Sequence, residues 1–337
     1  MQKFLIIQTA FIGDVVLATA MVEKLAQHYP EARIDFLVRR GNEGLLQNNP
    51  HLHEVLVWNK KEHKLKNLFA VLFRIRKTKY DKVINLQRFF ATGLLTAFSA
   101  AEESIGFDKN PLSFFFTKKI KHIISKGNGT RHEVERNNDL IRSFTDDVFN
   151  RPKLYPSSTD ISVIESYTRS PYVTMTPGSV WFTKQYPVEK WIELISNFPP
   201  GYAVYLLGGK ENAAECEHIK NSAVNAKAEV LAGKLSFLQS AALMRTAAMN
   251  YVNDSAPLHF ASAVNAPVTA VFCSTVPAFG FTPLSDRSFI IETPEKLGCR
   301  PCGLHGHKAC PEKHFKCAFT IQTDRLIETL EKNGMNV

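Results

Sequence analysis

A single aspartate follows the first apolar run of the chain, where it could accept a proton from a bound hydroxyl group. Phe4 to Ile7 suit a buried parallel strand, and Gln8 to Gly13 turn the chain before Asp14. Open α/β sheets bind ligands beyond the carboxyl ends of their strands, so a carboxylate here would face a ligand. The spaced glycines of a dinucleotide fingerprint are missing. Asp14 therefore suits a catalytic base and, equally well, a helix N-cap.

A second segment that could bind an anion follows the predicted strand Tyr172–Thr176. The loop after this strand combines small and hydroxyl residues with one lysine, namely Ser179, Thr183 and Lys184. Hydroxyl groups, loop amides and a lysine suit a phosphorylated ligand, although the spacing does not match a Walker P-loop. The alternative is the ordinary start of a capped helix after Pro187.

A third segment places a carboxylate and a hydroxyl group at the end of the predicted strand Asn250–Val252. Asp254 and Ser255 precede a predicted helix whose first turn contains Pro257. The N–H groups at a helix start attract anions, and this turn consists of Ala256, Pro257, Leu258 and His259. The His259 side chain would contact a phosphate group or form a hydrogen bond within the fold. Two phosphate-type loops on one protein favour a nucleotide ligand over two ordinary caps.

The elements that would position these residues alternate between strand and helix. In the first half, further strands are expected at 33–38, 52–58 and 82–86, with the clearest helix at 61–77. The alternation stops at about 146–170, where prolines and serines interrupt the chain, and then restarts. In the second half, strands are expected at 203–207, 229–231 and 268–272, and helices at 188–197, 212–221, 237–246 and 258–264.

This pattern predicts an α/β protein of two Rossmann-like, doubly wound parallel-sheet domains that face a central cleft. The first domain is expected at residues 1–160 and the second at residues 161–320. A C-terminal helix within 321–337 could pack back on the first domain.

Charge is concentrated in the first half of the chain. Nine basic and two acidic residues lie between Lys60 and Lys82, in a chain with a formal net charge of +9. Lys64, Arg74 and Lys77 should point outward from the helix there, which predicts an acidic partner or, alternatively, a solvated helix face. A sequence pI of about 9.2 is compatible with nucleic-acid binding, but no recognition motif supports it. The N-terminus lacks a signal-peptide pattern, so we expect a cytoplasmic protein.

Five motifs occur together and in order: Phe11-Ile12-Gly13-Asp14; Pro177-Gly178-Ser179 with Thr183-Lys184-Gln185-Tyr186-Pro187 and Trp191; Leu207-Gly208-Gly209-Lys210-Glu211; Asn253-Asp254-Ser255-Ala256-Pro257-Leu258-His259; and Cys299-Arg300-Pro301-Cys302 with Cys310, His314 and Cys317. The set resembles the ADP-heptose:lipopolysaccharide heptosyltransferases, glycosyltransferase family 9, over nearly the whole chain. The resemblance implies a GT-B fold, with the acceptor in the first domain and the nucleotide-sugar in the second. It also implies inverting transfer of heptose from ADP-heptose to a lipopolysaccharide core or lipid A-linked acceptor.

The resemblance also implies roles for individual residues. Asp14 matches the family's catalytic base, Lys184 and Ser179 match contacts to the donor phosphates, and Glu211 matches a residue near the donor ribose. The diphosphate-binding turn corresponds to Asp254, Ser255 and the residues from Ala256 to His259, and Thr183 lies in the matching donor motif. Acceptor contacts are expected from Gly13, Lys64, Arg74 and Lys77. Two positions depart from the family pattern, because many members have glycine at Ala256 and arginine at Ser104.

The expected chemistry needs a base and a source of positive potential. An ionised aspartate can take the proton of the attacking hydroxyl, since that group is too weak an acid to ionise at neutral pH. The chain has no Asp-X-Asp pair of the kind that holds a divalent metal in many sugar transferases. Lys184 and the helix start after Ser255 would stabilise the departing diphosphate instead. We therefore expect catalysis without a cofactor, with the ADP-sugar as substrate.

Four of the six cysteines lie close together in the sequence, with three histidines among them. Cys299, Cys302, Cys310 and Cys317 have a ligand density that could build a tetrahedral zinc site. A cytosolic location argues against structural disulfides. We favour reduced thiols that shape a loop beside the cleft over a structural zinc ion.

Two other functions fit the same scaffold: a sugar-nucleotide epimerase, which needs no acceptor, and a non-catalytic nucleotide-sugar-binding protein. For the transferase, the partners are ADP-heptose or a related nucleotide-sugar and a lipopolysaccharide-type acceptor at the inner membrane surface, with no nucleic acid. The basic segment Lys61–Lys79 would attach the protein to the anionic inner face of that membrane. The sequence leaves open the donor sugar, the acceptor and the linkage.

Overall fold

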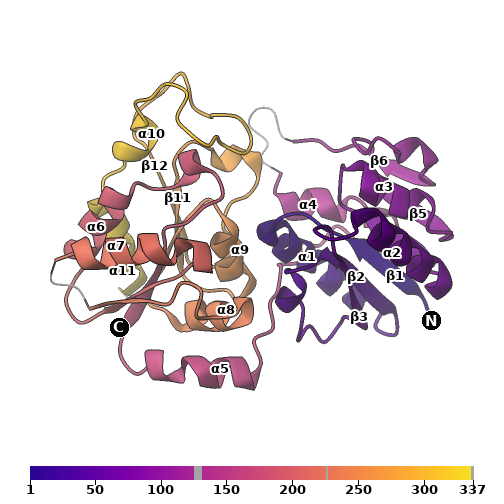
Figure 1. The fold of residues 1–337 in the computed structure, drawn as a ribbon, viewed down its shortest axis with the longest axis horizontal. Helices are drawn as coiled ribbons and strands as arrows, with labels where there is room; N and C mark the ends of the chain where they lie inside the picture. The colour runs from indigo at the N-terminus through magenta and orange to yellow at the C-terminus, as the bar shows by residue number, and fades with distance from the viewer. Residues whose placement is uncertain (125–130, 225–226, 335–337) are drawn as a thin grey trace. The chain divides into compact units, whose positions relative to one another are not determined.

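The computed structural model describes residues 1–124, 131–224 and 227–334. The chain folds into two compact units, Met1–Tyr155 and Pro156–Val337 (Figure 1). The division lies close to the boundary expected near residue 160, within the segment where proline and serine interrupt the strand–helix alternation.

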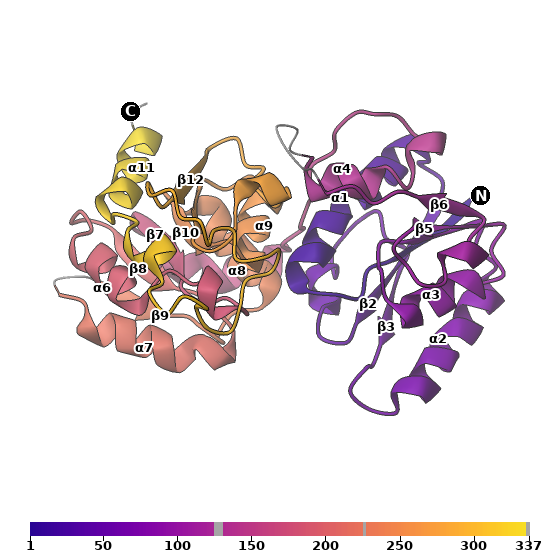
Figure 2. The same ribbon diagram turned by 90° about the horizontal axis from the view of Figure 1, so that it is seen from above.

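The N-terminal unit is built on a six-stranded parallel sheet in the order β3-β2-β1-β4-β5-β6. Its strands are β1 (Lys3–Ile7), β2 (Arg33–Arg39), β3 (Glu54–Trp58), β4 (Lys82–Asn85), β5 (Glu103–Phe107) and β6 (Lys118–Ile120). Its helices are α1 (Ile12–His28), α2 (Lys64–Thr78), α3 (Phe90–Ala97) and α4 (Glu133–Asn138), with short 3-10 turns η1 (Glu43–Leu45), η2 (Ser113–Phe115) and η3 (Arg142–Phe144). Helices α1 and α4 cover one face of the sheet, and α2 and α3 cover the other (Figures 1 and 2).

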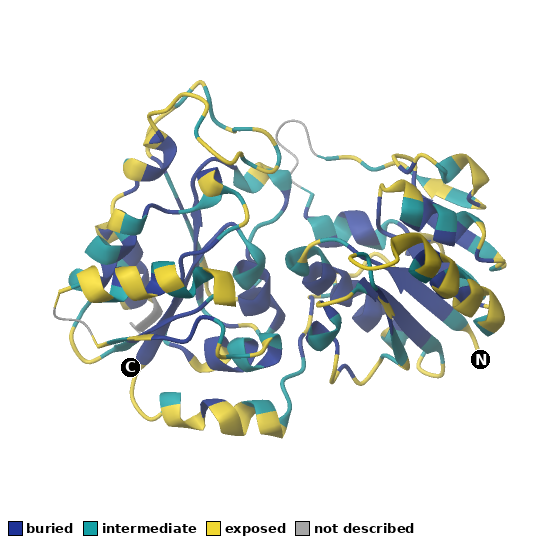
Figure 3. Ribbon diagram, in the orientation of Figure 1, coloured by how far each residue is buried: buried dark blue, intermediate teal, exposed yellow. Residues whose placement is uncertain are grey.

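Apolar periodicity explains these elements. The strand β1 is buried on both faces, as its continuous apolar sequence predicts. Helix α2 buries Leu68, Val71 and Ile75, which recur at helical spacing and join Leu5 and Leu56 of the sheet in one core cluster. Figure 3 shows the resulting contrast between buried strands and the exposed outer side of α2.

The C-terminal unit repeats the same architecture. Its six-stranded parallel sheet runs β12-β11-β10-β7-β8-β9, which is the same order as in the first unit when strands are counted along the chain. The strands are β7 (Tyr172–Thr176), β8 (Ala203–Leu206), β9 (Ala228–Val230), β10 (Asn250–Asn253), β11 (Val268–Phe272) and β12 (Ser288–Glu292). The helices are α5 (Ser158–Ile164), α6 (Val188–Ser196), α7 (Ala213–Ser222), α8 (Phe237–Thr246), α9 (Ala256–Ala263), α10 (Lys316–Phe319) and α11 (Asp324–Gly334), with 3-10 turns η4 (Glu165–Tyr167), η5 (Phe182–Lys184), η6 (Lys210–Asn212) and η7 (Pro277–Phe279).

The predicted fold class, two doubly wound α/β domains, is confirmed by these two sheets. The sequence did not indicate β5, β6 or β12, and β6 has no buried residue that could have produced an apolar signal. The C-terminal helix α11 belongs to the second unit, where Leu326 and Leu330 lie in the core with Trp191. The expectation that this helix could also pack back on the first domain stays a prediction. Within the described residues, every helix is too short or too polar to cross a bilayer.

Candidate active site

The ligand edge of the N-terminal unit lies beyond the carboxyl ends of β1 and β4. These strands are adjacent at the point where the strand order reverses, which is where open α/β sheets bind ligands. Gly13 and Asp14 follow β1 as the second and third residues of α1, and Phe11 is the N-cap. Asp14 is therefore a first-turn residue of α1 and not its cap, and its negative charge is favourable at the start of a helix.

Three side chains hold the loop that carries Asp14. The Lys60 ammonium donates to the carbonyl oxygen and to the hydroxyl oxygen of Thr9, both at 2.9 Å. The Asn42 amide donates to the Ala10 carbonyl oxygen at 3.1 Å. The Gln87 amide, which follows β4, donates to the Gln8 side chain in the same loop. These bonds fix the backbone between β1 and α1, so the start of α1 has a defined position.

Lys60 adds a positive charge to this edge, and its pKa lies not far above neutral pH. Burial, with smaller contributions from Arg39 and Lys64, lowers the pKa of Lys60 to about 8. Lys60 lies over the Trp58 ring at 4.6 Å, and the Arg39 guanidinium lies 5.9 Å from the centre of the Phe11 ring. The ligand edge of this unit therefore combines a carboxylate on α1 with Arg39, the last residue of β2, and Lys60, which follows β3.

The predicted acceptor residues on α2 are spread along the helix. Helix α2 follows β3, so its first residue, Lys64, lies at the ligand edge, whereas Arg74 and Lys77 lie toward the opposite edge. Arg74 forms an ion pair with Glu54, the first residue of β3. The structure thus brings Gly13 and Lys64 to the edge that carries Asp14, and it places Arg74 and Lys77 away from it.

The ligand edge of the C-terminal unit contains an ion pair between two predicted site residues. Lys184 lies in the loop after β7 and Asp254 follows β10, and these two strands are adjacent at the switch point of the second sheet. The Lys184 ammonium lies 2.7 Å from Asp254 Oδ2, and the two side chains are 16% and 7% exposed. Thr275 donates to the same carboxylate oxygen at 2.6 Å. Asp254 therefore holds Lys184 in a nearly buried position.

The loop from Pro177 to Pro187 is shaped by the end of β10. The Asn253 amide donates to the Pro177 carbonyl oxygen at 2.5 Å, and its oxygen accepts the Tyr186 backbone N–H at 2.9 Å. The Gln185 amide donates to the Ser179 carbonyl oxygen at 2.7 Å, which folds the loop across itself. These bonds set the direction in which Lys184 leaves the loop.

Helix α9 begins next to this ion pair. Ser255 is its N-cap, and a proline occupies the first turn, as the sequence predicted. The Ser255 hydroxyl is buried and has no hydrogen-bond partner among the described residues. Pro257 has no N–H group and the Leu258 N–H donates to the Ser255 carbonyl oxygen at 3.1 Å, so the Ala256 N–H and the Ser255 hydroxyl are the donors that this turn offers to an anion. The first turn continues through Ala256, Pro257, Leu258 and His259, and His259 is buried with its ring 6.4 Å from that of Phe281.

Glu211 lies at the same edge of the second sheet. It is an exposed residue of η6, which follows β8. Gly178 of the Lys184 loop approaches Asn212 so closely that a Cβ atom on Gly178 would lie 2.5 Å from the Asn212 side-chain nitrogen. Ser179, Lys184, Glu211 and the start of α9 are therefore carried by loops that follow neighbouring strands.

The cysteine-containing loop, residues 299–317, is fastened to the Lys184 loop. The backbone N–H of His307 donates to the Thr183 hydroxyl oxygen at 2.8 Å, and the backbone N–H of Thr183 donates to the His307 carbonyl oxygen at 3.1 Å. Ser274 donates to the Thr183 hydroxyl at 3.0 Å. The Arg300 guanidinium donates to carbonyl oxygens of Phe272, Cys273 and Thr275, so the loop also encloses the end of β11.

Among the described residues, the cluster of Cys299, Cys302, Cys310 and Cys317 does not bring three potential ligand atoms within 4.8 Å of one another. Cys299 Sγ lies 3.9 Å from His314 Nε2, and burial together with the neighbouring thiols raises the pKa of Cys302. Burial also raises the pKa of Cys317, to about 12. Cys216 and Cys273, outside the cluster, are fully buried.

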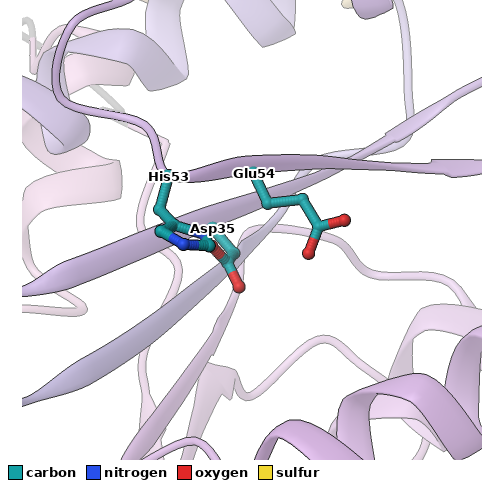
Figure 4. A group of neighbouring side chains, drawn as sticks. All are labelled: Asp35, His53 and Glu54. Atoms are coloured by element: carbon teal, nitrogen blue, oxygen red, sulfur yellow. The ribbon is translucent and has the colours of Figure 1, made fainter.

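One other group has the side-chain types of a metal site. Of the residues described, Asp35, His53 and Glu54 are the set of three or more potential ligands whose atoms all lie within 4.8 Å (Figure 4). Arg33 forms ion pairs with Asp35 at 2.9 Å and with Glu54 at 3.2 Å, and Tyr80 donates to Asp35. Guanidinium groups therefore already neutralise these carboxylates, and we interpret the group as a structural ion-pair network.

Comparison with known proteins identifies the family. The sequence profile described as "Glycosyltransferase family 9 (heptosyltransferase)" matches residues 69–315. The chain belongs to glycosyltransferase family 9. Lipopolysaccharide heptosyltransferase 3 of Escherichia coli is 28% identical over 279 residues, which cover 79% of this chain and 82% of the relative.

Solved structures of the family have the same fold. The glycosyltransferase family 9 protein of Veillonella parvula has a TM-score of 0.86 and 21% identity, and the match covers 100% of this chain and 98% of that one. The ADP-heptose lipopolysaccharide heptosyltransferase II of E. coli has a TM-score of 0.80 and 20% identity, with 99% and 98% covered. The present family 9 chain is thus a glycosyltransferase, and its predicted relationship to heptosyltransferases is confirmed.

Several residues that shape the site of this family 9 enzyme were not predicted. Asn253 and Thr275 orient the Lys184 loop and Asp254, and Lys60 holds the Asp14 loop. The sequence could have indicated Asn253 and Lys60 as site residues, because each lies at or just after the carboxyl end of a strand. No sequence pattern indicated the contact between Gly306 and Thr183, because it joins segments that are far apart in the sequence.

Proposed function

We propose that this enzyme transfers heptose from ADP-heptose to a lipopolysaccharide-type acceptor, with inversion at the anomeric carbon and without a metal ion. The observation that carries the proposal is the Lys184–Asp254 ion pair beside the start of α9. A cation and a helix N-terminus together suit the two phosphate groups of a nucleotide diphosphate. Relatives named as lipopolysaccharide heptosyltransferases and as an ADP-heptose heptosyltransferase support the donor and the acceptor class.

In the proposed reaction, an acceptor hydroxyl oxygen forms a bond to the anomeric carbon while the bond from that carbon to the donor phosphate oxygen breaks. The ADP leaving group takes the electron pair of the broken bond. Asp14 accepts the hydroxyl proton as the new bond forms and later releases it to water. A general base of this kind typically contributes about 10²–10⁴-fold to the rate. The position of Asp14 in the first turn of α1, at the ligand edge, supports this role.

The second requirement is to stabilise the negative charge that grows on the diphosphate. Lys184, the Ser255 hydroxyl and the Ala256 N–H at the start of α9 are the groups assigned to this task. Asp254 does not face the phosphates as a ligand would, since its carboxylate is engaged by Lys184 and Thr275. We assign it as a positioning residue that aims the ammonium. Ser179, Thr183 and Glu211 complete the donor side, with Glu211 assigned to the ribose.

The acceptor belongs to the N-terminal unit in this proposal, and the enzyme works at the cytoplasmic face of the inner membrane. The exposed cations of α2 support attachment to an anionic membrane surface, where a lipid A-linked acceptor would be anchored. Gly13 and Lys64, at the ligand edge, are the predicted acceptor residues that remain assigned to acceptor contacts.

Calorimetric titration tests the donor half of the proposal. ADP-heptose, ADP, UDP and GDP would be titrated with and without EDTA into the wild type, Lys184→Met and the control Lys190→Met. Lys190 is a lysine of the same unit that pairs with Glu193 at 2.8 Å on α6 and lies outside the site. We expect selective binding of the ADP ligands, no effect of EDTA, and weaker binding in Lys184→Met alone. Preference for UDP or GDP ligands would overturn the named donor.

Transfer assays separate the proposal from its two alternatives. The enzyme would be incubated with ADP-heptose and a lipopolysaccharide preparation truncated in its inner core. We expect sugar transfer only when both are present. Conversion of the nucleotide-sugar without acceptor would favour an epimerase, and binding without any conversion would favour a non-catalytic protein.

A further inference from the structure

Six large apolar side chains of the N-terminal unit face solvent on α2, after α3 and on η2. They are between 47% and 72% exposed. We call them the aromatic surface: Leu65, Phe69, Phe73, Phe98, Phe114 and Phe115. Single exposed apolar residues are ordinary, but a group of large ones on neighbouring elements marks an interaction site.

The aromatic surface is continuous. Leu65, Phe69 and Phe73 follow one another at intervals of four residues, so they form a row along α2 beside the buried stripe. Arg76, one turn further along, donates to the Phe98 carbonyl oxygen at 3.2 Å and thereby joins the end of α2 to the end of α3.

The row then continues onto η2. The rings of Phe98 and Phe115 lie 6.0 Å apart between centres, and those of Phe114 and Phe115 lie 4.2 Å apart. None of the residues of η2 is buried, so its two phenylalanines do not serve the core of the unit. The outer side of α2 is exposed along its length in Figure 3.

Positive charge surrounds the aromatic surface. Residues 64–78 and 112–121 contain eight lysine and arginine residues and no aspartate or glutamate. Arg74 is paired with Glu54, and Lys118 donates to Ser143. The remaining six are exposed: Lys64, Lys66, Arg76, Lys77, Lys119 and Lys121. The partner of this surface must therefore be negatively charged and must also accept aromatic rings.

The chemistry of the surface favours a lipid bilayer over a protein. Protein interfaces are depleted in lysine and place their aromatic residues in a core that excludes charge. Interfacial membrane helices instead combine lysine and arginine with phenylalanine and leucine, because the rings enter the acyl boundary while the cations meet the headgroups. We propose that the aromatic surface inserts into an anionic lipid bilayer and that the surrounding cations bind its headgroups.

This inference rests on the proposed function in one respect, which is that the acceptor is anchored in a membrane. It adds the element that contacts the lipid. Helix α2 begins at the ligand edge of its sheet, the edge that carries the Asp14 loop. The eight helical steps from Leu65 to Phe73 extend about 12 Å from that edge at the rise of an α-helix. A bilayer in contact with this row therefore adjoins the edge assigned to the acceptor.

Vesicle flotation tests the proposal without donor or acceptor, so its result is independent of whether heptose transfer occurs. Vesicles of phosphatidylethanolamine and phosphatidylglycerol would be compared with vesicles of phosphatidylcholine. The test variant is Phe73→Ser/Phe114→Ser/Phe115→Ser. The matched control is Ile161→Ser/Val163→Ser/Val224→Ser, which removes exposed apolar side chains from the other unit. Because all six positions are exposed, both variants should keep the wild-type unfolding midpoint, which circular dichroism would verify.

We expect the wild type and the control to float with the anionic vesicles, with weaker flotation at high salt. The phenylalanine variant should lose at least about tenfold in its partition coefficient. A Lys66→Gln/Lys77→Gln variant should lose the preference for anionic over neutral vesicles. Equal flotation of the phenylalanine variant and the control, or no flotation of the wild type, would overturn the proposal. So would gel filtration showing that the aromatic surface joins two copies of the chain while leaving vesicle binding unaffected.

Discussion

The Thr183 hydroxyl oxygen accepts a hydrogen bond from the backbone N–H of His307 at 2.8 Å. This bond joins the loop after β7 to the cysteine-containing loop, although the two residues are far apart in the sequence. Gly306, with φ at +76°, lies directly against Thr183, Lys184 and Ser274. The residue preceding Lys184 thus depends on a glycine in a distant loop for its position.

A side chain at Gly306 should weaken ADP binding. A Cβ atom there would lie 2.8 Å from Thr183 Oγ1 and 3.1 Å from Lys184 Cγ, so the Lys184 loop must move. We expect Gly306→Ala to lower ADP affinity about tenfold, or about 1.4 kcal/mol. Gly303→Ala is the matched control, because Gly303 also has a positive φ, +70°, but open space around its Cβ position. Equal affinities of the two variants in calorimetry would refute the contact's role.

Breaking the Lys184–Asp254 ion pair should destabilise the C-terminal unit. Lys184→Met leaves a nearly buried carboxylate without its cation, which typically costs about 3 kcal/mol. Lys184→Met/Asp254→Asn should recover part of that loss, since the amide is neutral and can still accept from Thr275. Urea unfolding of the single and double variants measures the difference. A double variant no more stable than Lys184→Met would show that the pair is not coupled.

Local sequence patterns predicted the parts of the fold that are determined locally. The burial of β1 and the start of α9 with Ser255 as N-cap both follow from short-range signals, namely a continuous apolar run and a proline in the first helical turn. The strand β6 has three residues, two of them lysines, and pairs with β5 through its backbone. No side-chain pattern could reveal it.

The candidate site was predicted in part for the same reason. Asp14, Lys184 and Asp254 each follow a strand, so the parallel fold alone brings them to ligand edges. The ion pairing of Arg74 with Glu54 was not foreseen, because it depends on how α2 lies against β3. The supports from Asn253 and Gly306 likewise require the register between segments that the sequence does not specify.

Lys60 should make stability depend on pH. Its pKa is lowered from 10.5 in the unfolded chain to about 8, so the folded state disfavours the charged form. Below pH 8 both states hold the proton and the full penalty applies. Between pH 8 and 10.5 the unfolded state binds more protons, so this penalty diminishes and stability rises. Relative to Lys60→Met, the wild type should therefore gain urea resistance between pH 7.5 and 9.5. The exposed neighbour Lys61→Met is the control, and a pH-independent difference for Lys60→Met would contradict the lowered pKa.

Substitutions of Asp14 test directly whether its carboxylate is catalytic or structural. Asp14→Asn keeps the size of the side chain but removes the base, so the proposed transfer should slow by about 10²–10⁴-fold. ADP affinity should stay unchanged, because the groups assigned to the donor lie in the other unit. Loss of one charge in the first turn of α1 should cost no more than about 1 kcal/mol of stability. Asp14→Glu keeps a carboxylate and should retain more activity than Asp14→Asn, which a purely structural role would not produce. If Asp14→Asn slows transfer less than tenfold and loses only stability, the carboxylate serves the start of the helix, and the base must be sought elsewhere at the same edge.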